Sequence, residues 1–68
     1  MNEIIEALKL KYMGDIASAK ANVSVYLTNP AGIGEHPDIV AAVDSQIDII
    51  AHAEDKLDAL ANHYGKDE

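Results

Sequence analysis

Residues 29–38 read NPAGIGEHPD and interrupt a chain whose remaining patterns are helical. Pro30 lacks an amide hydrogen and disfavours helical geometry in the residue before it, so a first helix is expected to stop there. Gly32 and Gly34 provide backbone freedom for a reversal, and Pro37 suits the first turn of a second helix. The sequence therefore predicts an all-α antiparallel hairpin, with a helix over about 3–28, a loop at 29–36, a helix over about 37–64 and a tail at 65–68.

Length and composition place narrow limits on how such a chain is stabilised. The 68 residues suffice for one small domain spanning 1–68. A chain of this size buries only about 60 % of its unfolded surface and is marginally stable alone. No cysteine is present, so disulfides and thiolate metal sites cannot reinforce it. Well-formed helices and oligomerisation remain as the ways in which such a chain can be stabilised.

The first helical pattern has an apolar stripe and a second, shallower apolar face. Asn2 is expected to cap the helix at its N-terminus. The apolar residues of the stripe are spaced by three and four positions, which places them on a single helix face. They are Ile5, Leu8, Tyr12, Ile16, Ala19, Val23 and Tyr26, joined by Leu27. The second face, beside Gly14, consists of Leu10, Ala17, Ala21 and Val25. Two apolar faces are typical of a helix with neighbours on two sides, as in a bundle.

The second helical pattern is a heptad-like seam. Its members are Ile39, Val43, Gln46, Ile50, Ala53, Leu57, Leu60 and Tyr64, widened on one side by Val40, Ile47 and Ala61. Gln46 is the one polar member; it either specifies register or oligomer state, or lies at an edge bonded to water. If the helices pack antiparallel, residue i is expected to face residue 66 minus i.

Two helices form one seam and leave the rest of each apolar arc exposed to water. Dimerisation into a four-helix bundle would cover these arcs, so a homo-oligomer, with a dimer favoured, is expected. The predicted oligomer interface comprises Leu10, Ala17, Ala21, Val25, Gln46, Ile50 and Leu57.

The charge balance is acidic, with 12 Asp and Glu against 5 Lys and a net charge of −7. Such a balance argues against direct binding to nucleic acid or to an anionic membrane surface. An aspartate stripe at residues 44, 48, 55 and 58 is expected to be solvated or to meet a basic partner. With no signal peptide and no apolar run of about 20 residues, the chain is expected to be cytoplasmic.

Catalytic, cofactor and metal sites are not expected. The Gly32–Gly34 pair lacks the third glycine, the Walker lysine and the preceding strand of phosphate-binding loops. His52 and Asp48 share a helix face, but two ligands are too few for a tight metal site. No serine has a histidine placed as its base. We therefore expect no enzyme activity.

The run from Ala19 to Asn22, the run from Tyr26 to Ile39 and the tetrapeptide 54–57 resemble short uncharacterised helical-hairpin proteins of tailed, often marine, bacteriophages. The resemblance covers about half the chain and centres on the loop. It implies a phage accessory setting, including the cytoplasm of an infected bacterial host, and assigns no functional residue.

These observations predict a non-enzymatic helical interaction protein that self-assembles, with a host protein as a further partner. One alternative is an oligomer that sequesters a small molecule such as a nucleotide second messenger. Its contacts would be Lys9, Lys20, Tyr26, Gly32 and Gly34. Another alternative is an acidic decoy that occupies a nucleic-acid-binding protein through the aspartate stripe.

Overall fold

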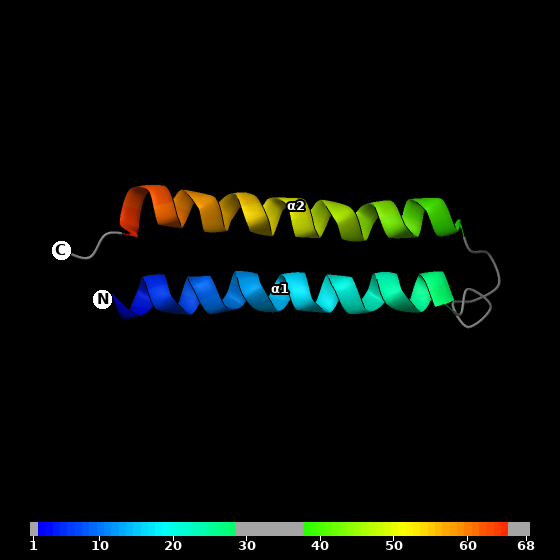
Figure 1. Ribbon diagram of the computed structural model, residues 1–68, viewed down its shortest axis with the longest axis horizontal. Helices are drawn as coiled ribbons and strands as arrows, with labels where there is room; N and C mark the ends of the chain where they lie inside the picture. The colour runs from blue at the N-terminus through cyan, green and yellow to red at the C-terminus, as the bar shows by residue number, and fades with distance from the viewer. Residues whose placement is uncertain (1, 29–37, 66–68) are drawn as a thin grey trace.

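The computed structural model describes residues 2–28 and 38–65 and shows two antiparallel helices packed side by side (Figure 1). Helix α1 runs from Glu3 to Thr28 and helix α2 from Ile39 to Tyr64, each with 26 residues. At 1.5 Å per residue both are about 39 Å long, so they match along their whole length. The antiparallel hairpin expected from the break at 29–38 is confirmed.

Each helix begins at a side chain that caps its free amide groups. The Asn2 Oδ1 accepts hydrogen bonds from the amides of Ile4 (2.7 Å) and Ile5 (3.3 Å). The Asp38 Oδ1 accepts one from the Ala41 amide at 3.0 Å. Asp38 is thus the cap of α2, which begins two residues later than the expected start at Pro37. Pro37 itself, like Gly32 and Gly34, lies outside the described residues.

Removing the α2 cap should lower stability by a predictable amount. We expect Asp38→Ala to reduce the free energy of unfolding by about 1 kcal/mol, because the Ala41 amide loses its acceptor. Asp38→Asn should cost much less, because asparagine is an equally good capping residue. Urea denaturation followed by circular dichroism at one protein concentration measures both. Equal losses for the two variants would mean that the charge of Asp38, rather than its capping oxygen, stabilises α2.

The helices pack along the predicted seam. On α1, every member of the expected stripe from Ile5 to Tyr26 is buried or half-buried, apart from the added Leu27. On α2 the same holds for the seam from Ile39 to Leu60. Only Ala19 and Ala53, at 1 % and 3 % exposure, are buried among the described residues. Their small side chains permit the closest approach of the two helices.

The observed register differs by about two residues from the expected one. Asn22 hydrogen-bonds Gln46 across the seam, and the Lys56 ammonium lies over the Tyr12 ring. The residue numbers in each pair add up to 68, where 66 was expected. Contacts between residues distant in the chain decide this register, and the helical periods alone do not specify it.

Five residues assigned to the two apolar stripes are in fact exposed. Leu27 is 68 % exposed, Val40 81 %, Ile47 47 % and Tyr64 64 %, and Ala61 is exposed as well. The reason is geometric: one neighbouring helix covers a narrow stripe, whereas these residues widen the stripe or lie at its end. Tyr64 is the last residue of α2, level with the first turn of α1, where little chain remains to cover it.

Candidate interaction surface

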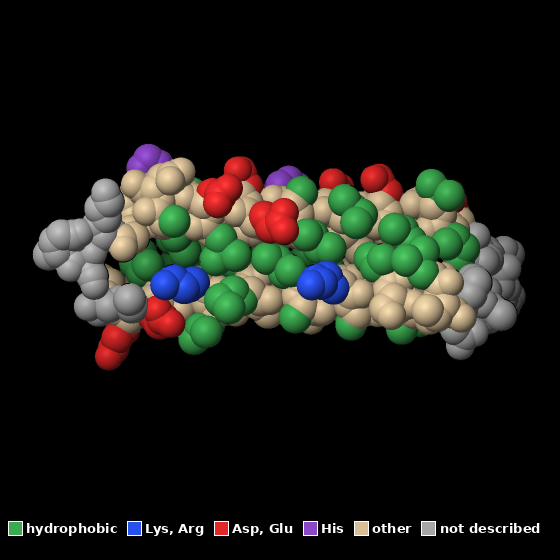
Figure 2. All heavy atoms as spheres, viewed as in Figure 1, with side chains coloured by type: hydrophobic (Ala, Val, Ile, Leu, Met, Phe, Trp, Pro, Cys, Tyr) green, Lys and Arg blue, Asp and Glu red, His purple; other side chains and the backbone are tan. Residues whose placement is uncertain are grey.

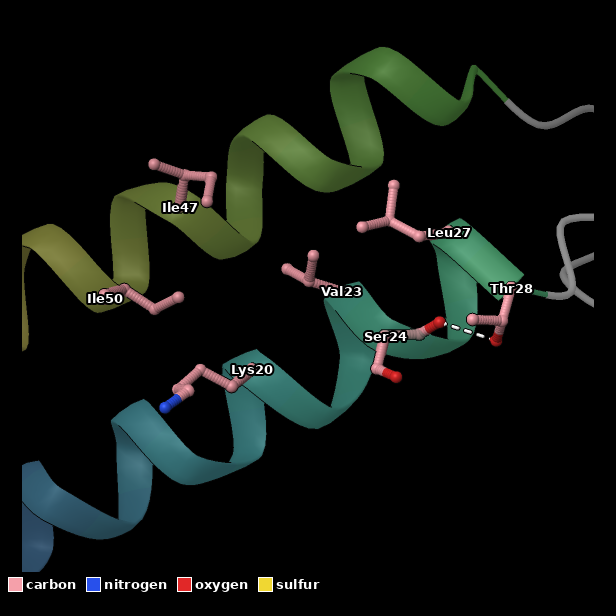
Figure 3. A pocket seen from close by; sticks show the side chains of 7 residues that line it. All are labelled: Lys20, Val23, Ser24, Leu27, Thr28, Ile47 and Ile50. Carbon is pink, nitrogen blue, oxygen red and sulfur yellow. Dashed lines mark hydrogen bonds between the residues drawn. The ribbon is translucent and has the colours of Figure 1, made fainter.

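A hollow opens between the helices near the end of α1 (Figure 3). Its volume is about 340 Å³, and it is lined by Lys20, Val23, Ser24, Leu27, Thr28, Ile47 and Ile50. The side chains of Val23 and Leu27 point from α1 toward α2. The Thr28 hydroxyl donates a hydrogen bond to the Ser24 carbonyl at 2.7 Å, so its polarity is satisfied within its own helix. The lining is therefore chiefly aliphatic, with one ammonium group at its border.

The hollow marks one edge of the seam, which we call the front edge. Residues seven apart on a helix share nearly the same direction. Lys20 and Leu27 belong to such a line on α1, which continues back to Met13. Ile47 belongs to the matching line on α2. The front edge is defined by two lines: Met13, Lys20 and Leu27 on α1, and Val40, Ile47 and Glu54 on α2.

The front edge is rich in exposed apolar side chains. Its members Met13, Leu27, Val40 and Ile47 are 52 %, 68 %, 81 % and 47 % exposed. Figure 2 shows apolar side chains running along the border between the helices, with lysines at the border on α1 and carboxylates on α2. Scattered exposed apolar residues are ordinary, whereas a contiguous group beside a hollow is typical of an interaction site.

The opposite edge, which we call the back edge, is more polar. Asn22 Nδ2 donates a hydrogen bond to Gln46 Oε1 at 3.0 Å, bridging the helices there. Two ammonium groups lie near the Tyr12 ring, with Lys11 Nζ at 5.8 Å and Lys56 Nζ at 5.3 Å from its centroid. Two lysines therefore lie at one level of this edge, and the Asn22–Gln46 pair bridges the helices about three turns away.

The Asn22–Gln46 bond should contribute a measurable coupling energy. We expect the double-mutant cycle of Asn22→Ala and Gln46→Ala to give about 0.5–1 kcal/mol, the size of a partly exposed neutral hydrogen bond. Unfolding by urea of the two single variants and the double variant supplies the cycle. Strictly additive losses would show that the bond does not contribute to register, and that Gln46 acts only through packing.

The residues predicted for the oligomer interface lie in two separate parts of the hairpin. Leu10 and Val25 are 58 % and 51 % exposed, and Ala17 and Ala21 are exposed beside them on the outer face of α1. A Cβ atom added to the neighbouring Gly14 would meet nothing within 4 Å, so this face is open. The remaining three, Gln46, Ile50 and Leu57, lie half-buried in the seam of the hairpin itself.

The predicted ligand contacts are only partly brought together. Lys20 borders the hollow, whereas Tyr26 is not among its lining residues. Lys9 lies eleven residues before Lys20 on α1, about 16 Å away along the axis. Lys9 also faces Glu6 at 3.7 Å in an exposed ion pair. Gly32 and Gly34 lie outside the described residues, so their predicted contacts remain predictions.

The aspartate stripe runs along the outer side of α2 and comes close to the front edge at Asp58. Asp44, Asp48, Asp55 and Asp58 are all exposed, and carboxylates gather along that side of the molecule (Figure 2). Within residues 2–28 and 38–65, the ion pairs are Lys9–Glu6 and Lys11–Asp15, both on α1. The stripe therefore has no cation to offset it on the described part of the chain.

The front edge was missed as a surface by the sequence reasoning. Leu27, Val40 and Ile47 were placed in the seam, and Met13 was not assigned at all. The seven-residue lines from Met13 to Leu27 and from Val40 to Glu54 could have identified it. These lines were not recognised because each contains a charged residue, Lys20 on α1 and Glu54 on α2.

Among residues 2–28 and 38–65, no group of three or more His, Asp or Glu side chains could hold a metal ion. Within these same ranges, neither helix combines the length and apolar character needed to cross a lipid bilayer. No family model matches the chain, and no curated protein or solved structure is significantly similar to it.

Proposed function

We propose that the protein is a non-enzymatic helical interaction protein that self-assembles, as a dimer forming a four-helix bundle. One observation supports this above all: of the described residues, only Ala19 and Ala53 are buried in the single hairpin. On the described part of the chain, nine large apolar side chains are, by contrast, more than 40 % exposed. Two buried alanines and a half-buried stripe on each helix supply little apolar burial to offset the conformational entropy of ordering two 26-residue helices.

The surface area of the chain supports a partner of the same size. A compact protein of 7.3 kDa is expected to expose about 4,200 Å². This chain exposes 5045 Å², which is roughly 850 Å² more than that scaling predicts. One partner in a standard protein interface buries about 800 Å². Pairing two copies would therefore bring the exposed surface of each chain close to the value that the scaling gives for its own mass.

The chemistry of the described surface favours binding over catalysis. None of the buried side chains in the described ranges is polar or charged. The hollow of Figure 3 is lined chiefly by aliphatic groups, which suit apolar contact and not acid–base chemistry. The resemblance to phage hairpin proteins supports an accessory role in an infected bacterial cell, where a host protein would be the second partner.

Sedimentation velocity and native mass spectrometry on the full chain test self-assembly. Between about 1 and 100 μM, where interfaces of this standard size commonly form, we expect a species of twice the 7.3 kDa chain mass. The melting temperature should rise with protein concentration, since dimers are stabilised by mass action. A fully helical monomer throughout this range would overturn the proposal.

A second candidate function is sequestration of a small molecule, and the hollow beside Lys20 favours it. The aliphatic lining with one ammonium suits a small amphipathic anion. A ligand with several phosphates, such as a nucleotide second messenger, would need more cations than Lys20 alone, because Lys9 is about 16 Å distant. A thermal-shift panel of nucleotides and amphipathic carboxylates tests this function, with Lys20→Gln as the control. No shift at millimolar ligand would exclude it.

A further inference from the structure

We infer that the front edge is the surface through which two copies pair, around a twofold axis parallel to the helices. In this arrangement α1 of each copy lies beside α2 of the other, and the two α1 helices are diagonal. The inference rests on the proposed self-assembly and specifies its geometry. It differs from the sequence prediction, which put the outer face of α1 at the interface, together with Gln46, Ile50 and Leu57 of α2.

The apolar side chains on the front edge are placed to meet in such a pair. Residues that face each other across the two antiparallel helices at this edge have numbers that add up to 67, as in Leu27 with Val40 and Lys20 with Ile47. Rotation about a twofold axis parallel to the helices does not move a residue along the helix axis, so Leu27 would also meet the partner's Val40. Both residues are more than 65 % exposed in the single hairpin. The hollow is lined by Val23, Leu27, Ile47 and Ile50, among others. In the pair it would face the same hollow of the partner, and side chains of the two copies would fill it.

Charges support the same edge. Lys9 is close to the front line of α1, and Asp58 to that of α2, and their numbers also add up to 67. Pairing at the front edge would place each Lys9 level with the partner's Asp58, twice by symmetry. Among residues 2–28 and 38–65, Lys9 forms an ion pair with Glu6 alone, at 3.7 Å, and this exposed pair has little energetic weight. Opposite charges at one level favour association, and their registry selects the orientation of the partner.

Charges on the back edge oppose pairing there. Lys11 and Lys56 lie at the same level, both beside the Tyr12 ring. A copy docked on this edge about the same axis would bring its own two lysines to that level. Four ammonium groups would then cluster without a matching set of carboxylates, because Asp15 already faces Lys11 at 3.3 Å. Like charges brought together in this way select against a wrong partner surface.

Single-cysteine variants test the arrangement, since the natural chain has no cysteine. Leu27→Cys protein is mixed with Val40→Cys protein, equilibrated to exchange subunits, and treated with a short bismaleimide. Neighbouring thiols within a dimer experience an effective concentration near millimolar, so the mixture should yield at least about tenfold more covalent dimer than either variant alone. Val25→Cys mixed with Val40→Cys is the matched control, because Val25 lies two residues from Leu27 but on the outer side of α1.

The outcomes separate this inference from the proposed self-assembly. A dimer by native mass spectrometry that shows no excess of the Leu27–Val40 cross-link would overturn the front-edge arrangement alone. Self-cross-linking of Val25→Cys would instead identify the outer face of α1 as the interface. A wild-type monomer would overturn both proposals. If either cysteine variant loses its helical circular dichroism, Lys9→Cys with Asp58→Cys tests the other end of the same edge, with the same expected excess.

Discussion

Ala53→Leu should lower the free energy of unfolding by about 1–3 kcal/mol, a large fraction of the stability of so small a protein. Ala53 is 3 % exposed and lies in the seam between the helices. The three extra carbon atoms of leucine have no free space there, so α1 and α2 must separate or the side chain must leave its preferred rotamer. Thermal and urea denaturation at a fixed protein concentration measure the loss.

Ala51→Leu is the matched control for this prediction. It makes the same chemical change two residues earlier in α2, at an exposed position outside the seam between the helices. Alanine and leucine have nearly equal helix propensity, so we expect this variant to stay within about 0.5 kcal/mol of the natural protein. Equal effects of the two variants would show that the helices do not pack through the alanine contact.

Ile50→Ala should cost about 2 kcal/mol and also weaken dimerisation. Ile50 is half-buried in the seam and lines the hollow, so its truncation removes apolar contacts and enlarges an existing space. In the proposed dimer the same side chain would contact the partner, so the loss should exceed that expected from the single hairpin. Urea denaturation and sedimentation velocity, each over a range of protein concentrations, measure the two effects.

Ile49→Ala is the corresponding control, because Ile49 is adjacent in sequence and 42 % exposed. We expect it to cost less than about 1 kcal/mol and to leave the dimerisation constant unchanged. The opposite order of the two variants would contradict both the seam and the front-edge assignment. An effect of Ile50→Ala on stability without an effect on dimerisation would retain the seam and argue against the front-edge interface.

Some features of the fold followed from local sequence. Asn2 was identified as a cap because its side chain can reach the amides two and three residues further on, and it does. The stripe from Ile5 to Tyr26 was identified because the helical period alone decides which residues share a face. The candidate surface could be predicted less well from local sequence. Lys20 was selected as a ligand contact and does border the hollow, but the Met13–Leu27 line was not recognised beside it.

The sequence by itself determined two helices, their antiparallel packing and the residues between them, because backbone hydrogen bonds, caps and a 3.6-residue period depend only on near neighbours. Only the tertiary structure decided the register, since the Asn22–Gln46 bond and the Ala19 and Ala53 contacts join residues distant in the chain. It also decided which apolar residues are covered. One neighbouring helix shields only a narrow stripe, so Leu27, Val40 and Ile47 are left exposed although their sequence pattern matches that of the core.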